Sequence, residues 1–244
     1  MSPAITLATV RRILFQLRHD HRTVALIVAV PSVLMVLLYY VIDNQMVFNR
    51  WAPMLLGVFP FIAMFLVTSI ATLRERSTGT LERLMTMPLG KLDLLLGYAI
   101  AFGLMALIQV GLVLTIAMTW LGLEFAGSVG VLTVAAVLNA LLGVALGLFS
   151  SAFSRTEFQA VQMLPALVLP QLLLSGLLVP RDQMATVLEW LSNVMPLSYA
   201  IEAMQEVTVS AGITETLWRD IAVIGGCVLL VLVLAAATLR RRTP

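Results

Sequence analysis

Few residues in this sequence have the types and spacing that chemistry requires. The segment His19-Asp20-His21 could hold a metal ion, but this spacing is more typical of solvated residues at a membrane surface. Gly90-Lys91-Leu92 differs from the phosphate-binding loop of an ATPase, which needs Gly-Lys-Ser or Gly-Lys-Thr after a glycine-rich turn. A single cysteine, Cys227, excludes an intrachain disulfide and a multi-cysteine metal site. We therefore expect this chain to bind no cofactor or metal and to have no catalytic residues.

The composition indicates a membrane protein. The chain has 244 residues, of which 60% are hydrophobic and 11% are charged, and its mean hydropathy is +1.00. Soluble domains are about 45–50% apolar and about 25% charged, whereas disordered chains combine low hydrophobicity with high charge. An ordinary soluble enzyme and a disordered chain are thus both excluded. The net charge of +2 is too small to indicate binding to nucleic acid.

The long runs without Asp, Glu, Lys, Arg or His are candidate membrane spans. About 20 apolar residues are needed to cross the hydrocarbon core as a helix. Only Glu124 separates the third run from the fourth, which predicts a tight hairpin between them. We expect an all-α integral membrane protein with one transmembrane domain over 1–244 and six spans, at 23–42, 51–73, 94–123, 125–154, 158–180 and 221–239.

The distribution of basic residues predicts the orientation of these spans. The two termini and the loops on their side hold 12 of the 15 lysines and arginines. The other side holds only Arg50, Arg181 and Arg219. Because loops rich in Lys and Arg stay in the cytoplasm, we expect a multi-pass protein of the cell (cytoplasmic) membrane with both termini cytoplasmic.

Two segments outside the spans have amphipathic patterns. Residues 3–22 are expected to form an interfacial helix whose basic residues meet lipid head groups. Its expected apolar face consists of Leu7, Val10, Ile13, Leu14 and Leu17. The external connection 181–220 is expected to hold two half-immersed helices. The second of these should run from about Ser198 to Val209, and the first should have an apolar face made of Met184, Val187, Leu188, Leu191 and Met195.

The cytoplasmic stretch 74–93 carries seven charged residues among its twenty. Thr80 can cap a short helix, Leu81, Leu84 and Met85 would then share one face, and Pro88 would end it. An apolar face on a short cytoplasmic helix needs a covering. The helix either lies on the membrane, with Arg74, Arg76 and Arg83 at lipid phosphates, or docks into a cytosolic partner.

Polar residues within the spans are candidates for a substrate path. The alternative is that they form hydrogen bonds between helices, and the pair Gly143 and Gly147 is more typical of close helix packing than of function. No Asp, Glu, Lys or Arg lies in the middle of a span, which argues against ion-coupled transport and favours an apolar or amphipathic cargo. The candidates are Thr68, Ser69, Gln109, Asn139, Gln162, Gln171 and Ser175.

Two motifs carry a family resemblance. The first consists of Glu75-Arg76, Gly79-Thr80-Leu81-Glu82, Pro88-Leu89, Asp93 and Leu96-Gly97, and the second is Pro196-Leu197-Ser198-Tyr199-Ala200 followed by Ile201-Glu202-Ala203. With these motifs the chain resembles the type-2 ABC exporter permeases over essentially its whole length. The family often has Lys where this chain has Tyr98, and Arg where it has Gln205.

The resemblance implies partners and a mechanism. In that family two permease chains pair, as a homodimer or a related heterodimer. Each carries a separate ABC ATPase subunit, so the complex has two copies of the ATPase, and these bind ATP and Mg. From the length of 244 residues we expect no fused nucleotide-binding domain and hence an ATPase on a separate chain. The expected ATPase-coupling residues are Glu75, Thr80, Leu81, Glu82, Leu84, Met87 and Pro88, and the external motif supplies Pro196, Ser198, Tyr199 and Glu202.

The resemblance also implies a cargo class. We expect multidrug or antibiotic efflux, or export of a lipid-like molecule, along a path near the second and fifth spans at the interface of two chains. Two alternatives remain open, namely a non-transporting membrane scaffold or immunity protein of the same fold, and a permease that translocates lipid. An enzyme acting on lipids is disfavoured because the spans contain neither a His-Glu-x-x-His motif nor paired acids.

Overall fold

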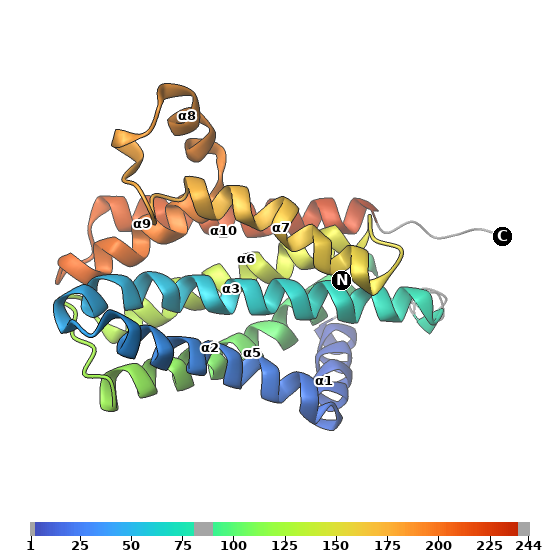
Figure 1. The fold of residues 1–244 in the computed structure, drawn as a ribbon. Coiled ribbons are helices and arrows are strands. Elements are labelled where there is room, and N and C mark those ends of the chain that lie inside the picture. Colours follow the sequence, from blue (N-terminus) through green and yellow to red (C-terminus); the bar gives the residue numbers. More distant parts are fainter. Residues whose placement is uncertain (1–2, 81–89, 239–244) are drawn as a thin grey trace.

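The protein is a bundle of helices, described by a computed structural model for residues 3–80 and 90–238 (Figure 1). Within these ranges no residue lies in a strand, and six helices are long and apolar enough to cross a membrane. This confirms the all-α membrane fold. The six are α2 (His21–Ile42), α3 (Gln45–Ser77), α5 (Lys91–Thr119), α6 (Val129–Ser151), α7 (Glu157–Leu174) and α10 (Glu215–Thr238).

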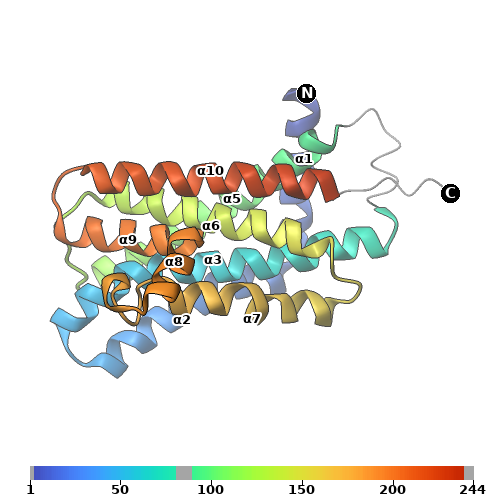
Figure 2. The same cartoon turned by 90° about the horizontal axis from the view of Figure 1, so that it is seen from above.

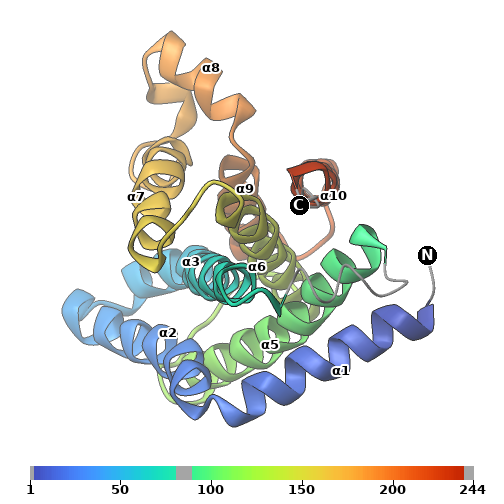
Figure 3. The same ribbon diagram turned by 90° about the vertical axis from the view of Figure 1, so that its right-hand side faces the viewer.

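The centre of the bundle is the contact between α3 and α6, around which the other helices are arranged (Figure 3). Gly147 of α6 faces the backbone of α3, since a Cβ atom there would lie 2.6 Å from the Phe65 carbonyl oxygen. Gly143 faces the Phe61 carbonyl oxygen more closely still. The two glycines therefore pack the helices backbone to backbone, as their spacing predicts.

The tight hairpin expected around Glu124 is wrong. Helix α5 ends at Thr119 and α6 begins at Val129, so residues 120–128 form a connection of their own. The backbone NH groups of Ala126 and Gly127 donate to carbonyl oxygens of α9 (Pro196–Val209). Leu121 and Leu123 are buried within this connection, so it is apolar enough to read as part of the spans on either side, and Glu124 is its one charged residue.

Other helix ends also differ from the charge-free runs. With 33 residues, α3 extends beyond 51–73 at both ends and is about 50 Å long, against about 30 Å for a hydrocarbon core. Its charged residues thus belong to terminal turns of the helix. The fifth span ends at Leu174 instead of residue 180, followed by Gly176 at a φ of +85°, and the sixth begins six residues early, at Glu215.

Helix α1 (Pro3–His19) lies across one end of the bundle, nearly perpendicular to the long helices (Figures 1 and 2). We call this end the α1 end. Val10, Ile13 and Leu17 are buried against the bundle, mainly against α5. Leu7 is 69% exposed and does not pack against the bundle, so its expected contact with lipid stays a prediction. A helix that crosses the bundle axis fits the expected position along a membrane surface.

The external connection contains a short 3-10 turn (Arg181–Gln183) and two helices, α8 (Thr186–Val194) and α9. The predicted second helix is confirmed as α9, which packs against α3, α6 and α10. By contrast, α8 stands away from the bundle beyond the end of α7 (Figures 1 and 3). Its predicted apolar residues Val187, Leu188 and Leu191 are exposed, and within α8 the buried residue is Ser192.

Candidate functional site

A cluster at the α1 end joins three helices through one carboxylate. Arg12 Nη1 of α1 lies 3.2 Å from Glu75 Oε1 at the end of α3, and the Tyr98 hydroxyl of α5 donates to the same carboxylate. The Arg12 and Glu75 side chains are only 26% and 13% exposed. Because the pair is largely shielded from water, its attraction is screened less than that of a surface pair. Glu75 therefore ties α1, α3 and α5 together.

Helix α1 is held against α5 by a second set of contacts. The Thr6 hydroxyl donates to Asp93 Oδ1 over 3.2 Å. A Cβ atom at Gly97 would lie 2.5 Å from Thr9 Cγ2, so the absence of a side chain at Gly97 is what lets α1 approach. Both Asp93 and Gly97 belong to the first motif found in the sequence. In this structure they act as contact points for the crossing helix.

The ends of α3, α6 and α7 are also linked at the α1 end. Arg74 donates through Nε and Nη2 to the two carboxylate oxygens of Glu157, at 2.6 and 3.1 Å. Arg76 donates to the Ser151 carbonyl oxygen. Two of the arginines considered as lipid contacts are thus bound within the protein, which draws the start of α7 and the end of α6 to α3.

The predicted coupling segment adjoins this cluster. Helix α3 ends at Ser77, Gly79 has a φ of +72°, and α5 begins at Lys91, so both flanks of the segment lie at the α1 end. The Thr80 hydroxyl lies 3.0 Å from that of Thr78. The other expected coupling residues lie outside the described residues, namely Leu81, Glu82, Leu84, Met87 and Pro88.

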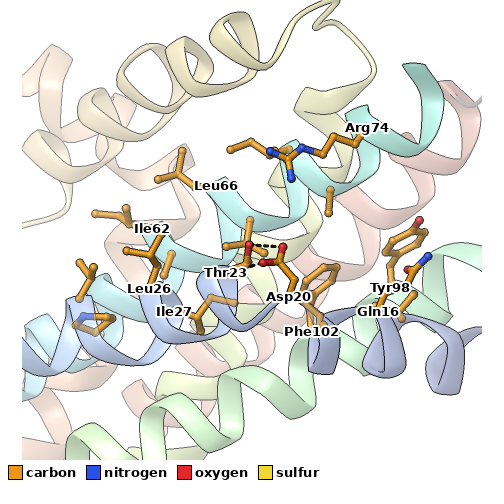
Figure 4. A pocket seen from close by; sticks show the side chains of 18 of the residues that line it. Gln16, Asp20, Thr23, Leu26, Ile27, Ile62, Leu66, Arg74, Tyr98 and Phe102 are labelled. Atoms are coloured by element: carbon orange, nitrogen blue, oxygen red, sulfur yellow. Dashed lines mark hydrogen bonds between the residues drawn. The ribbon is translucent and has the colours of Figure 1, made fainter. Parts of the chain in front are cut away.

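A cavity of about 700 Å³ lies beside the cluster, between α1, α2 and α3, with Tyr98 and Phe102 of α5 at its base. Most of its lining is apolar. Figure 4 shows Asp20 bonded to Thr23 and Arg74 of α3 standing apart from that pair, away from the apolar side chains of Leu26, Ile62 and Leu66. The Asp20 carboxylate accepts from the Thr23 hydroxyl at 2.6 Å and from the Thr23 backbone NH at 3.1 Å. These bonds lower the pKa of Asp20, so it is ionised at neutral pH.

The predicted path residues are not brought together by the fold, and none of them is among the residues that line this cavity. Ser69 Oγ lies 3.1 Å from Ser150 Oγ, and Asn139 Nδ2 donates to the Gly57 carbonyl oxygen at 2.9 Å. These two residues therefore form the interhelical hydrogen bonds that were the alternative to a path. Thr68, the neighbour of Ser69 in α3, is also buried.

The remaining path candidates lie on α5 and around α7. Gln109 is fully buried, and among the described residues its amide group has no hydrogen-bond partner. Gln171 Nε2 donates to the Leu167 carbonyl oxygen, and the Ser175 hydroxyl donates to that of Leu172. Gln162 faces outward from α7. A path through these residues stays a prediction.

The external motif forms a clamp at the opposite end of the bundle. The two carboxylate oxygens of Glu202 on α9 each bind one arginine. Oε2 lies 2.6 Å from Arg181 Nη1, and Oε1 lies 3.0 Å from Arg219 Nη2. Both guanidinium groups lie over the Tyr199 ring, 5.3 and 5.9 Å from its centroid. Arg219 also binds the buried carboxylate of Asp220 at 2.8 Å. This clamp therefore joins the external connection to the start of α10.

Polar side chains of α8 and of the external motif hold the connection from α7 to α9. The Ser192 hydroxyl donates to the Leu174 carbonyl oxygen at 2.7 Å and lies 3.1 Å from the Ser198 hydroxyl. The Tyr199 hydroxyl donates to the Asn193 carbonyl oxygen at 2.7 Å, and Pro196 starts α9 at its first position. The serines and the tyrosine thus satisfy backbone carbonyls where the chain is irregular.

Sequence reasoning missed Arg12, Tyr98 and the lining of the cavity. A usable signal existed for Tyr98, because it stands where related sequences often have a lysine, another donor that could reach Glu75. At Gln205, the second such departure, Nε2 lies 3.2 Å from Met54 Sδ. Asp20 was set aside as a solvated residue of the interface, and its role as the N-cap of α2 depends on the turn at residue 20.

Comparison with known proteins gives a consistent result. A family model described as "ABC-2 type transporter" matches residues 3–209. The Escherichia coli protein "Probable multidrug ABC transporter permease YbhR" is 27% identical over 174 residues, 70% of this chain and 47% of that protein. "Inner membrane transport permease YhhJ" of E. coli is 24% identical over 185 residues, 72% and 50%. "ABC transporter G family member 20" of Dictyostelium discoideum is 26% identical over 164 residues, 67% and 22%. The aligned part is thus half or less of each relative's length.

Proposed function

The chain belongs to the ABC-2 type transporter family, and from this we propose that it is the membrane-spanning subunit of an ATP-driven exporter. It would move an apolar or amphipathic substrate out of the cytoplasm or the inner leaflet. The permease would contribute a path and two conformations, and the energy would come from ATP hydrolysis elsewhere in the complex.

The partners follow from the same premise. A separate ABC ATPase would bind in two copies and hold ATP and Mg, and a second permease chain would complete the path. Support comes from the sequence, in which Lys91 is the only lysine and is not followed by Ser or Thr. The bias of basic residues supports a cell-membrane protein with both termini cytoplasmic. In that orientation the α1 end faces the ATPase.

The observation that carries this proposal is the position of Glu75. Its carboxylate binds Arg12 and Tyr98, five residues before the expected coupling residue Thr80. A displacement of the coupling segment would therefore pull on α1, α3 and α5 together. Thermodynamically, ATP bound by the partner would favour one arrangement of the spans, and hydrolysis would release it.

Support for the substrate class comes from two sources. The relative YbhR is named a multidrug permease, and the middle of each span lacks Asp, Glu, Lys and Arg. An ion-coupled carrier usually needs such a residue at mid-membrane.

The test is purification of the tagged chain from native membranes in mild detergent, followed by mass spectrometry of the proteins that accompany it. We expect a stoichiometric ABC ATPase, lost in the variants Glu82→Arg and Leu84→Arg. Val187→Arg on exposed α8, at the opposite end, is the matched control and should retain the ATPase. If no ATPase accompanies the wild-type chain in several detergents, a non-transporting scaffold of the same fold becomes the better interpretation.

A further inference from the structure

The cavity between α1, α2 and α3 is bordered by exposed apolar residues of α2. We propose that it binds one phospholipid of the adjoining leaflet, with an acyl chain between α2 and α3 and a zwitterionic head group at Asp20 and Arg74. Its volume of about 700 Å³ falls within the range of small-molecule sites, roughly 300–1,000 Å³. Binding of the lipid at this site would require neither ATP nor transport.

The apolar part of the cavity has the shape of a slot for a chain. On α3 the apolar lining runs from Phe59 to Ala71, a rise of about 18 Å along the helix, compared with the ~15 Å of one leaflet in a 30 Å core. On α2 the facing residues Leu26, Val30 and Leu34 are 63%, 46% and 41% exposed. The outer wall is therefore reached directly from the bilayer.

The packing of α2 leaves room for such a chain. Only 17% of the most apolar stretch of α2 is buried inside the protein, whereas 56% of the corresponding stretch of α3 is buried. The α3 wall, including Ile62, Ala63 and Leu66, is only half-buried where it faces the cavity. The apolar part of the cavity is filled most favourably by an acyl chain, since each buried CH₂ group contributes about 0.8 kcal/mol.

The polar end of the cavity matches a head group with both charges. Among the described residues the Asp20 carboxylate accepts hydrogen bonds from Thr23 and has no cationic group within 4 Å. It is therefore available to a cation. Arg74 uses Nε and Nη2 for Glu157, which leaves Nη1 for an anion. Arg22 adds a second positive charge close enough to lower the pKa of Asp20.

These charges favour a zwitterionic lipid over an anionic one. An ammonium group at Asp20 and a phosphate at Arg74 would satisfy both sides of the polar end. An anionic lipid such as phosphatidylglycerol would meet the arginines but leave Asp20 without a cation. A purely cationic amphiphile would be repelled by the surrounding arginines. Phosphatidylethanolamine therefore represents the proposed ligand chemistry.

The test uses the full chain with its copurified partners in vesicles of phosphatidylethanolamine and phosphatidylglycerol. The probe is phosphatidylethanolamine with a photoactivatable diazirine in its acyl chain, and labelled peptides are found by mass spectrometry. We expect labelling of the α3 wall around Ala63 and Leu66 to exceed labelling of lipid-facing Leu229 and Leu230 on α10. Unlabelled phosphatidylethanolamine should compete for the site, and phosphatidylglycerol should compete less.

Two variants separate chain binding from head-group binding. Ala63→Phe fills the slot and should lower labelling of the α3 wall about ten-fold, whereas the control Ala29→Phe, on the exposed face of α2, should not. Asp20→Asn keeps a side chain that caps α2 equally well but removes the charge. It should reduce the preference for phosphatidylethanolamine about three-fold.

The proposal fails if labelling of the α3 wall equals that of α10, or if Ala63→Phe leaves it unchanged while the variant elutes as the wild type does. It also fails in its head-group part if Asp20→Asn does not alter the preference between the two lipids. The readout needs no ATP hydrolysis. A negative labelling result would therefore say nothing against the proposed ATPase partner. Conversely, loss of the ATPase would not change the lipid labelling.

Discussion

Arg12 and Glu75 are 63 residues apart in the chain, and their charged atoms lie 3.2 Å apart at the α1 end of the bundle. The Tyr98 hydroxyl reaches the same carboxylate from α5. The contact places the crossing helix, the end of the longest span and the start of the next span under one electrostatic constraint.

Glu75→Gln should lower the stability of the purified protein by about 1–2 kcal/mol, because it leaves the half-buried Arg12 without its counter-charge. The measurement is the apparent melting temperature in detergent. Arg12→Gln should have a similar effect, and the double variant should lose less than the sum of the two. The control is Arg11→Gln, an exposed position on the same helix. Equal stability of Glu75→Gln and this control would contradict the prediction.

Gly143→Ala should destabilise the bundle by roughly 1–3 kcal/mol, because the added Cβ atom would meet the Phe61 backbone on α3. Gly225→Ala on α10 is the matched control, since no atom lies within 4 Å of a Cβ there. In the control the gain in helix propensity should stabilise the protein by about 0.5–1 kcal/mol. Thermal unfolding of the two variants should therefore shift in opposite directions, and a shift in the same direction would argue against close α3–α6 packing.

Glu202→Gln should loosen the external connection, since it removes the carboxylate that pairs with Arg181 and Arg219. We expect limited proteolysis between residues 181 and 195 to become faster while the remaining bundle stays intact. Glu189→Gln, on exposed α8, serves as the control and should be cleaved at the wild-type rate. Unchanged cleavage in both variants would mean that the clamp does not hold this segment.

The proposed orientation can be tested with single cysteines. Cys227→Ala provides a background without cysteine, because Cys227 is the only one in the sequence. Val187→Cys on α8 should react with a membrane-impermeant maleimide in intact cells, whereas Arg11→Cys should react only after permeabilisation. Both positions are exposed, so access to the reagent depends on the side of the membrane. The reverse pattern would invert the topology.

The six spans could be predicted from sequence because burial in lipid demands long runs without charge. The ends of the helices could not, because hydropathy reports the environment of a residue and not its backbone hydrogen bonds. Leu121 and Leu123 lie in an irregular connection, yet they are as apolar as any residue of a span. Conversely, Arg74 and Glu75 are charged but still belong to α3, whose last turns extend beyond the apolar run.

The candidate site was only partly within reach of the sequence. The coupling role expected of Glu75 stays a prediction, and its partners within the chain come from α1 and α5 and depend on how those helices cross. The polar path candidates show the converse difficulty. Asn139 and Ser69 are polar within spans for a reason that only the packing of α3 on α6 reveals. Pairwise contacts across 80 residues leave no local pattern in the chain.

The contact between α3 and α6 has a consequence for biogenesis. Asn139 binds the carbonyl oxygen of Gly57, 82 residues earlier in the chain, so α3 enters the membrane before its main partner has been synthesised. Until α6 arrives, Thr68 and Ser69 must face lipid or the insertion machinery. The nascent protein would thus pass through a stage in which Ser69 lacks the Ser150 hydroxyl that it meets in the finished bundle.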